Sequence, residues 1–366
     1  MEIKGKVTGI KYKIQLSESL KEINIKDFNI NESPTFCLLK DGVNSFAVSK
    51  WVSPKRTRSY PYERVYNTLT SSKKITVIPI IKDEGAAGDR DFLQWDTVSL
   101  MSLLDVFVIF AYYEKAEINP RSKNKITNQQ FNNEYVISKI KEIEQYHSSA
   151  LHWNLNELSN NFTMLLNKAK NCYAEISEQT GVKMHDLNRI DTFEAHIQIN
   201  MISFMLFSRE KAEKAQAREM VTTQPKESLS TLTKARITIT NYLGGEYYFT
   251  VDEILIENDT VYLIESKHSK NSILPSNSDI KDGLLKMILY SNLCEVEVNG
   301  VKMRSKAVLN LTSAKIAKGF TSKIPAWERG DFLLYNDFSQ EQMRFVDALM
   351  EEGVENGFEV RIESLK

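Results

Sequence analysis

Residues 250–267 have the sequence TVDEILIENDTVYLIESK, in which two β-rich runs flank the dipeptide Asn258-Asp259. A two-residue turn at this dipeptide predicts a β-hairpin in which Asp252 lies opposite Glu265. Because side chains alternate between the two faces of a strand, Lys267 is expected on the same face as both acids. The hairpin therefore predicts three charged side chains in close proximity on one face of a sheet.

Two facing carboxylates would repel each other, since the β-carbons of cross-strand partners lie only about 5 Å apart. The flanking residues are apolar, so water would screen Asp252 and Glu265 poorly. A divalent cation removes the conflict, and Mg²⁺ is held by one or two carboxylates together with phosphate oxygens. Lys267 could orient or help deprotonate a water, or balance charge on a phosphate. The set predicts metal-assisted hydrolysis of a phosphodiester.

The sequence around the hairpin has the pattern of an α/β domain. Strict alternation begins at residues 236–240, and the strands of the hairpin are expected at 247–256 and 261–267. A helix is predicted over residues 279–293, with Ser278 or Asp279 as its N-cap. A strand at 306–311, a helix at 340–352 and a last strand at 357–362 complete the predicted domain.

Asp252, then Glu265-Ser266-Lys267 on the next strand, then an amphipathic helix, resembles the core of the PD-(D/E)xK nuclease superfamily. Val251 stands where the family usually has proline, and the resemblance covers roughly residues 190–312. It implies an α/β (α+β) fold with a restriction-endonuclease-like core, in which helices flank a mixed sheet. A chain of this size, with an additional N-terminal region and no helicase motif, is similar to a type II restriction endonuclease.

The resemblance implies that Asp252 and Glu265 bind Mg²⁺, for which Mn²⁺ can substitute, while Lys267 assists the attacking water. In this superfamily an acid on the preceding helix often adds a metal ligand, and Glu194 is the candidate. A capping-box glutamate explains Glu194 equally well. Lys286 falls where such nucleases present a side chain to DNA, although a solvated lysine on an amphipathic helix is an equal alternative.

The resemblance also implies double-stranded DNA as substrate and a cognate DNA methyltransferase as genetic companion. Cleavage of both strands by one site per chain predicts a homodimer. Two alternatives stay open. The chain could be a non-catalytic nucleic-acid-binding or assembly protein with a nuclease-like fold, in which the hairpin acids are structural remnants. For the residues themselves, the alternative is a surface salt bridge of Asp252 and Glu265 with Lys267 between them. The chain could also be a nuclease that acts on RNA or on branched DNA.

The sequence predicts three segments: a mixed N-terminal region over residues 1–115, a helical segment over 116–185 and the nuclease-like domain over 186–366. Strands are expected at 36–39, 45–48 and 74–81, and a buried helix over 89–113. The polar residues 115–133 are expected to form a linker, followed by two helices over residues 134–180.

The most basic window is residues 51–64, in which Lys55, Arg56, Arg58 and Arg64 alternate with aromatic residues. Such a segment suits contacts to DNA phosphates and readout of base edges by arginine. An ordinary exposed loop is the alternative. The N-terminal region is therefore the candidate for DNA recognition.

The composition of the chain excludes several classes of protein. The 366 residues include 42% hydrophobic residues, which excludes global disorder, and the net charge of −1 favours neither nucleic acid nor membrane. Three widely spaced cysteines form no CxxC pair, which argues against a zinc ribbon and fits a reducing cytoplasm. The sequence shows no P-loop, GxGxxG or GxSxG motif. Its most apolar run, residues 98–113, is shorter than the roughly 20 residues that a membrane span needs. A cytoplasmic protein without a membrane partner is expected.

Overall fold

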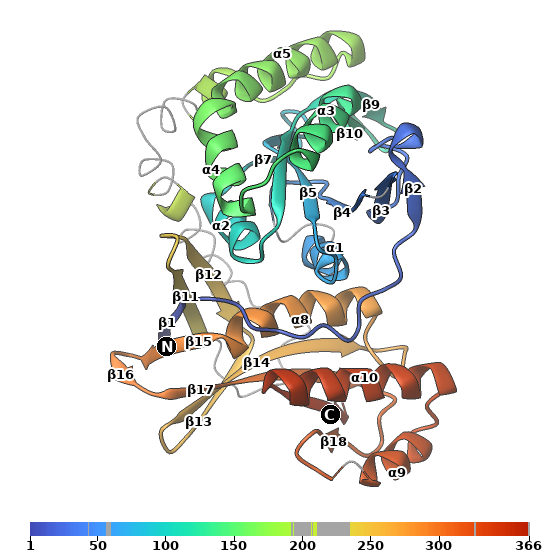
Figure 1. The fold of residues 1–366 in the computed structure, drawn as a ribbon, viewed down its shortest axis with the longest axis vertical. Helices are drawn as coiled ribbons and strands as arrows, with labels where there is room; N and C mark the ends of the chain where they lie inside the picture. The colour runs from blue at the N-terminus through green and yellow to red at the C-terminus, as the bar shows by residue number, and fades with distance from the viewer. Residues whose placement is uncertain are drawn as a thin grey trace. The chain divides into compact units, whose positions relative to one another are not determined.

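The computed structural model describes residues 1–42, 44–55, 60–191, 193, 206, 208–210, 235–325 and 327–364. The fold is mixed α/β with several sheets, as the sequence predicts (Figure 1). The chain forms two compact units, one of Met1–Glu18 with Glu210–Lys366 and one of Ser19–Arg209. This division differs from the predicted segments 1–115, 116–185 and 186–366, because the N-terminal residues belong to the same unit as the predicted hairpin.

The discontinuous unit contains a five-stranded mixed sheet built around the hairpin. Its strand order is β13 (Glu253–Glu257), β14 (Thr260–Ser269), β17 (Arg304–Ser313), β19 (Glu359–Ser364) and β18 (Phe320–Thr321). The outer pairs, β13–β14 and β18–β19, are antiparallel, and the inner pairs are parallel. The helices of this region are α8 (Asn277–Ser291), α9 (Trp327–Tyr335) and α10 (Gln340–Asn356).

The observed register of the hairpin confirms the predicted pairing, but the expected single strand at 247–256 is divided at Asp252 between β13 and a strand of another sheet. Glu257 pairs with Thr260 and Ile254 with Leu263, across a turn in which Asn258 has a φ of 55°. Parallel strands need a crossover connection, and α8 provides it between β14 and β17. The N-cap of α8 is Ser276, whose hydroxyl accepts a hydrogen bond from the Asp279 N–H at 3.1 Å. The helix therefore begins slightly earlier than the sequence predicts.

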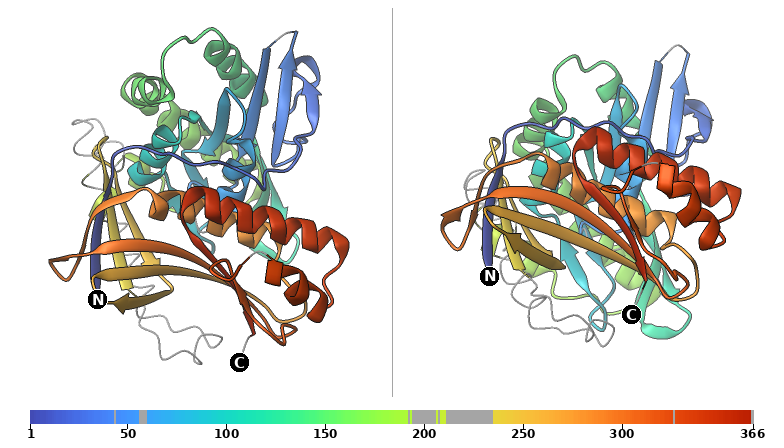
Figure 2. Two further views of the ribbon diagram at one scale, coloured as in Figure 1. Left: turned by 60° about the horizontal axis from the view of Figure 1, so that its bottom comes forward. Right: turned by 90° about the horizontal axis from the view of Figure 1, so that it is seen from below.

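Two helices pack on the same face of this sheet. Leu309 of β17 pairs in parallel register with Val360 of β19, so their side chains lie on one face. A Cβ on Gly283 of α8 would come within 3.0 Å of Leu309, and one on Gly353 of α10 would come within 3.0 Å of Val360. Both helices thus approach closely at glycines, and Figure 2 (left) shows them on one side of the strands.

A second five-stranded sheet of the same unit contains the first strand of the chain. Its order is β12 (Glu246–Val251), β11 (Ala235–Asn241), β1 (Glu2–Val7), β15 (Leu293–Val298) and β16 (Val301–Lys302). The central strand β1 is parallel to β11 and antiparallel to β15, and its Ile3 and Val7 are fully buried. The following segment is held by the buried Glu352 of α10, which accepts hydrogen bonds from the Tyr12 hydroxyl and the Gln15 N–H.

The Ser19–Arg209 unit has its own sheet and helices. The sheet order is β2 (Glu22–Asn24), β3 (Phe36–Asp41), β4 (Asn44–Lys50), β5 (Lys74–Pro79) and β8 (Phe107–Ala111). Two antiparallel pairs accompany it, β6 (Ile81–Asp83) with β7 (Arg90–Phe92) and β9 (Tyr113–Asn119) with β10 (Ser122–Phe131). Its helices are η1 (Ile25–Asp27), α1 (Pro61–Thr68), α2 (Trp95–Leu103), α3 (Asn133–Glu144), α4 (Ala150–Asn160) and α5 (Phe162–Thr180).

Three local predictions for this unit are wrong. Residues 89–113 contain β7, α2 and β8 in place of one buried helix, because a fully buried strand and a buried helix have the same continuous apolar pattern. The expected linker 115–133 is largely the hairpin β9–β10, whose strands are mostly polar because much of their length is exposed. Residues 134–180 form three helices, since Ser149 caps a separate α4.

No helix in the described part of the chain is long and apolar enough to cross a membrane.

The burial of β1 predicts a large cost for truncating Ile3. Replacing a fully buried isoleucine by alanine removes apolar contacts and leaves a cavity, so we expect Ile3→Ala to lower the free energy of unfolding by about 2–4 kcal/mol. The neighbouring Lys4 is exposed on the opposite face of the strand, and Lys4→Ala is the matched control, with an expected change within about 0.5 kcal/mol. Urea unfolding measures both values. Equal stabilities of the two variants would contradict a central position for β1.

Candidate active site

The β13–β14 hairpin positions the first acid of the site. The paired ladder ends at Glu253 and Ile264, and Asp252 is the next residue along the chain. The Oδ2 atom of Asp252 accepts a hydrogen bond from the backbone N–H of Ser266 at 3.0 Å. This bond holds Asp252 beside Glu265, the residue that the register places opposite it.

Glu265 lies under α8, between two lysines. Its residue surface is only 1% exposed. The Nζ atom of Lys286, on α8, donates to both carboxylate oxygens of Glu265 at 2.8 Å. The Nζ atom of Lys267, two residues further along β14, lies 3.1 Å from Oε1 of Glu265. The sheet and the helix therefore each supply one ammonium group to the same buried carboxylate.

A third carboxylate of the site, Asp282, is absent from the prediction. Its Oδ2 atom lies 3.6 Å from Nζ of Lys267. Asp282 precedes Lys286 by four residues, so both lie on one face of α8. That spacing is the signal that could have identified it. Between them, Gly283 gives room to Lys267, because a Cβ there would lie 3.2 Å from Cε of the lysine.

The ionisation of the acids follows from their neighbours. Burial and then the charge of Glu265 raise the pKa of Asp252 to about 6, although Lys286, the Ser266 N–H and Lys267 act in the opposite direction. Burial also raises the pKa of Asp282, against the opposing effect of Lys267. Burial alone would raise the pKa of Glu265, but Lys286 and Lys267 together outweigh it and hold that pKa below its ordinary value.

The cluster contains more carboxylates than ammonium groups. Three carboxylates, Asp252, Glu265 and Asp282, face two ammonium groups, and among the described residues no lysine or arginine nitrogen lies within 4.0 Å of Asp252. The oxygen ligands of Asp252 and Glu265 suit a hard divalent cation. The described residues contain no group of three or more acidic, histidine or cysteine side chains placed to bind a metal. A cation here would therefore use two carboxylates and complete its shell with water or phosphate, as Mg²⁺ does.

The remaining predicted site residues lie outside the described residues or belong to the other compact unit. Glu194, Arg56 and Arg58 lie outside the described residues. In the Ser19–Arg209 unit, Lys55 is exposed, with Nζ 3.9 Å from Oδ1 of Asp91. Arg64 is 8% exposed and donates to the backbone oxygen of Lys50 at 2.7 Å, which does not support the expected phosphate contact. A DNA contact of Lys286 stays a prediction.

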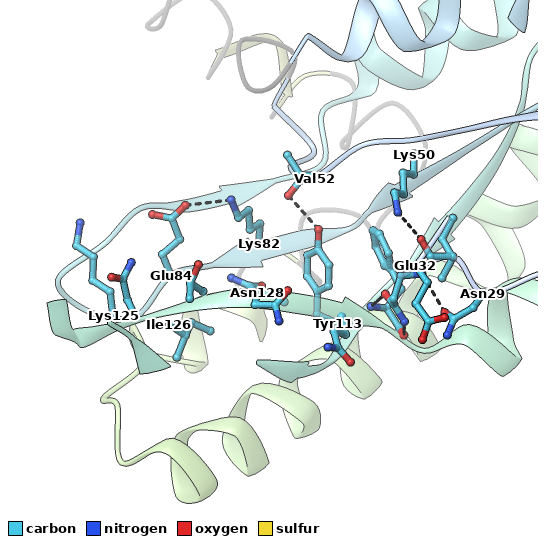
Figure 3. Close-up of a pocket in the computed structure, with 17 residues that line it drawn as sticks. Asn29, Glu32, Lys50, Val52, Lys82, Glu84, Tyr113, Lys125, Ile126 and Asn128 are labelled. Atoms are coloured by element: carbon cyan, nitrogen blue, oxygen red, sulfur yellow. Dashed lines mark hydrogen bonds and ion pairs between the residues drawn. The ribbon is translucent and has the colours of Figure 1, made fainter. Parts of the chain in front are cut away.

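The Ser19–Arg209 unit also contains a polar cavity of about 470 Å³ beside β10 (Figure 3). Much of its lining is already bonded within the unit. The Tyr113 hydroxyl donates to the oxygen of Val52 at 2.9 Å, and Lys82 forms an ion pair with Glu84 at 3.0 Å. Lys50 donates to the backbone oxygens of Ile30 and Ser33 at 2.5 and 2.7 Å. The polar groups of Tyr113, Lys82 and Lys50 are therefore engaged within the unit itself.

Comparison with protein-family models, with curated proteins and with solved structures finds no match to this chain. Its function must be inferred from the chemistry of its own residues.

The raised pKa of Asp252 predicts a pH-dependent effect of Asp252→Asn. Between the unfolded value of about 3.9 and the folded value of about 6, the folded protein retains a proton that the unfolded chain has lost. The contribution of Asp252 to the free energy of unfolding of the wild type therefore falls as the pH rises from about 3.9 to about 6. Asparagine is neutral and still accepts from Ser266, so the variant should be more stable than wild type at pH 8, by about 1–3 kcal/mol, and similar at pH 4.

Urea unfolding at pH 4, 6 and 8 in EDTA measures this difference. Asp331→Asn, at an exposed position on α9, is the control for the loss of one carboxylate outside the site. An Asp252→Asn variant that is less stable than wild type at pH 8 would contradict the proximity of Asp252 to Glu265.

Proposed function

We propose that this chain is a Mg²⁺-dependent endonuclease that hydrolyses phosphodiester bonds of double-stranded DNA. One observation carries the proposal: the register of β13 and β14 places Asp252 beside Glu265, with Lys267 on the same face. Two acids and a lysine in this arrangement are suited to phosphodiester hydrolysis with a divalent cation.

The topology around the cluster supports the proposal. The hairpin is followed by α8 and then by β17, which is parallel to β14. This order agrees with the PD-(D/E)xK core that the sequence resembles, and we propose a restriction-endonuclease-like core on this ground. Because α8 covers the face that carries Glu265, the acids lie in a partly dry environment in which their interactions with a cation or a phosphate are strengthened.

Each residue of the cluster has a distinct role in the proposed reaction. Asp252 and Glu265 would hold Mg²⁺, which when bound polarises the phosphodiester and lowers the pKa of a water. Lys267 presents its ammonium group 3.1 Å from Glu265, where it can orient the attacking water or balance charge that develops on the phosphate. Asp282, 3.6 Å from Lys267, restrains the position of that ammonium group.

The proposed substrate sets the expected assembly and partners. Cleavage of both strands of a duplex by one site per chain favours a homodimer. Lys55, exposed in the basic window of the Ser19–Arg209 unit, is a candidate for phosphate contact. A cognate DNA methyltransferase would be the companion of an enzyme with a fixed recognition sequence.

Cleavage of unmethylated plasmid and phage DNA tests the proposed activity. We expect discrete fragments with Mg²⁺ and none with EDTA. Because Lys267 acts at the reacting phosphate or water, Lys267→Ala should reduce the cleavage rate by about 10²-fold or more. Lys302→Ala, at an exposed position on β16, is the control and should cleave as wild type.

Two results would contradict the proposal. Cleavage in EDTA, or cleavage by Lys267→Ala at the wild-type rate, would exclude this cluster as the active site. Retention of DNA in a gel shift without any cleavage, on duplex DNA, branched DNA and RNA alike, would favour a non-catalytic nucleic-acid-binding protein.

A further inference from the structure

Lys286 forms an ion pair with Glu265, one of the two proposed ligands of Mg²⁺. Lys286 occupies both oxygens of the carboxylate that we assign to Mg²⁺, at 2.8 Å each. The pair is largely buried, with side-chain exposures of 18% for the lysine and 2% for the glutamate. A cation that binds Glu265 would therefore meet an ammonium group already in place.

We propose that Lys286 is a resident cation of the site, which competes with the divalent metal for Glu265 and is released towards the DNA when the metal binds. The proposal rests on the proposed function and adds a regulatory step to it.

The electrostatics of a buried carboxylate favour such a competition. An ionised carboxylate under a helix is costly unless a positive charge compensates it. Lys286 supplies that charge together with Lys267, so the site is stable without metal. The same two oxygens cannot be fully coordinated by a metal and fully bonded to Lys286. A metal that coordinates both oxygens therefore displaces the Lys286 ammonium group, and the metal affinity is lowered by the cost of that displacement.

The released ammonium group has two acceptors. Lysine carries its charge on a flexible four-carbon stem, so Nζ can move while α8 stays in place. Asp282, one turn earlier on the same face of α8, is a carboxylate whose present lysine contact is a longer 3.6 Å. A DNA phosphate is the second acceptor, with a full negative charge. A phosphate that receives Lys286 would remove the competitor, so DNA and metal should each increase the affinity for the other.

Another lysine on α8 provides a matched control. Lys281 is buried, with a side-chain exposure of 1%, and its Nζ lies 2.7 Å from Oε1 of Glu18. Both lysines are largely buried on α8, but Glu18 is 48% exposed and is not one of the three acids of the site. Loss of Lys281 should therefore affect stability without affecting metal binding.

The experiment measures Mn²⁺ binding by calorimetry and thermal unfolding in EDTA and in Mn²⁺, for wild type, Lys286→Met and Lys281→Met. Lys286→Met leaves Glu265 with less compensation, so its melting temperature in EDTA should fall below wild type, and Mn²⁺ should restore it. Its Kd for Mn²⁺ should be lower than wild type by about 10- to 100-fold, the range over which neighbours of metal ligands alter affinity. Lys281→Met should lose stability in both conditions and bind Mn²⁺ as wild type.

A DNA duplex added in the same calorimetry should lower the Kd for Mn²⁺ of wild type more than that of Lys286→Met. Lys286→Gln, expressed with Mn²⁺, is the second variant, because its amide can donate to Glu265 without a charge. If both Lys286 variants stay unfolded even with Mn²⁺, metal cannot replace the ammonium group and the proposal is wrong. Equal or weaker Mn²⁺ binding by folded Lys286 variants also overturns it.

Asp252→Asn separates this inference from the proposed function. If wild type binds Mn²⁺ and Asp252→Asn does not, the metal site stands, and only the Lys286 variants decide the competition. If neither wild type nor any Lys286 variant binds Mn²⁺, both the metal site and the competition are refuted. Binding by Lys286→Met alone would support the competition in its strongest form.

Discussion

The buried carboxylate of Glu265 is the constraint on which the rest of the site depends. An ionised group in this position must be compensated, and Lys267 and Lys286 converge on it from the sheet and from α8. Gly283 admits the side chain of Lys267 beneath the helix. Burial, and then the negative charge of Glu265, raise the pKa of Asp252 above that of an ordinary aspartate. The charged groups of the site are thus coupled, because each influences the ionisation of its neighbours.

The topology brings these charges together from the hairpin and from the helix that follows it. The hairpin and the hydrogen bond from the Ser266 N–H hold Asp252 beside Glu265, and the crossover helix returns over the same face before β17 begins. A helix in this position presents residues at intervals of four, which is why Asp282 and Lys286 reach the strand together. The close approach at Gly283 and Gly353 keeps both helices tight against the sheet. Hairpin, crossover helix and glycines are therefore parts of one arrangement around the acids.

The sequence predicts local features of this site well and long-range ones poorly. The hairpin register follows from a two-residue turn and a period of two, and both are encoded within residues 250–267. The ion pair of Lys286 with Glu265 depends on how α8 packs, which no local pattern specifies. The place of β1 requires pairing with strands more than 200 residues away. In residues 98–113, apolarity indicated burial but could not distinguish α2 from β8, since both are buried all round.

The central place of β1 has a consequence for biosynthesis. Residues 2–7 are made long before their partners at 235–241 and 293–298. The Ser19–Arg209 unit is synthesised after β1 and before its partner strands. It can therefore fold on the nascent chain while β1 is still unpaired. The sheet that contains β1 can therefore form only after both partner strands have been made. A polypeptide interrupted before β15 would expose a lone apolar strand edge, which makes prematurely terminated chains natural targets for chaperones and proteases.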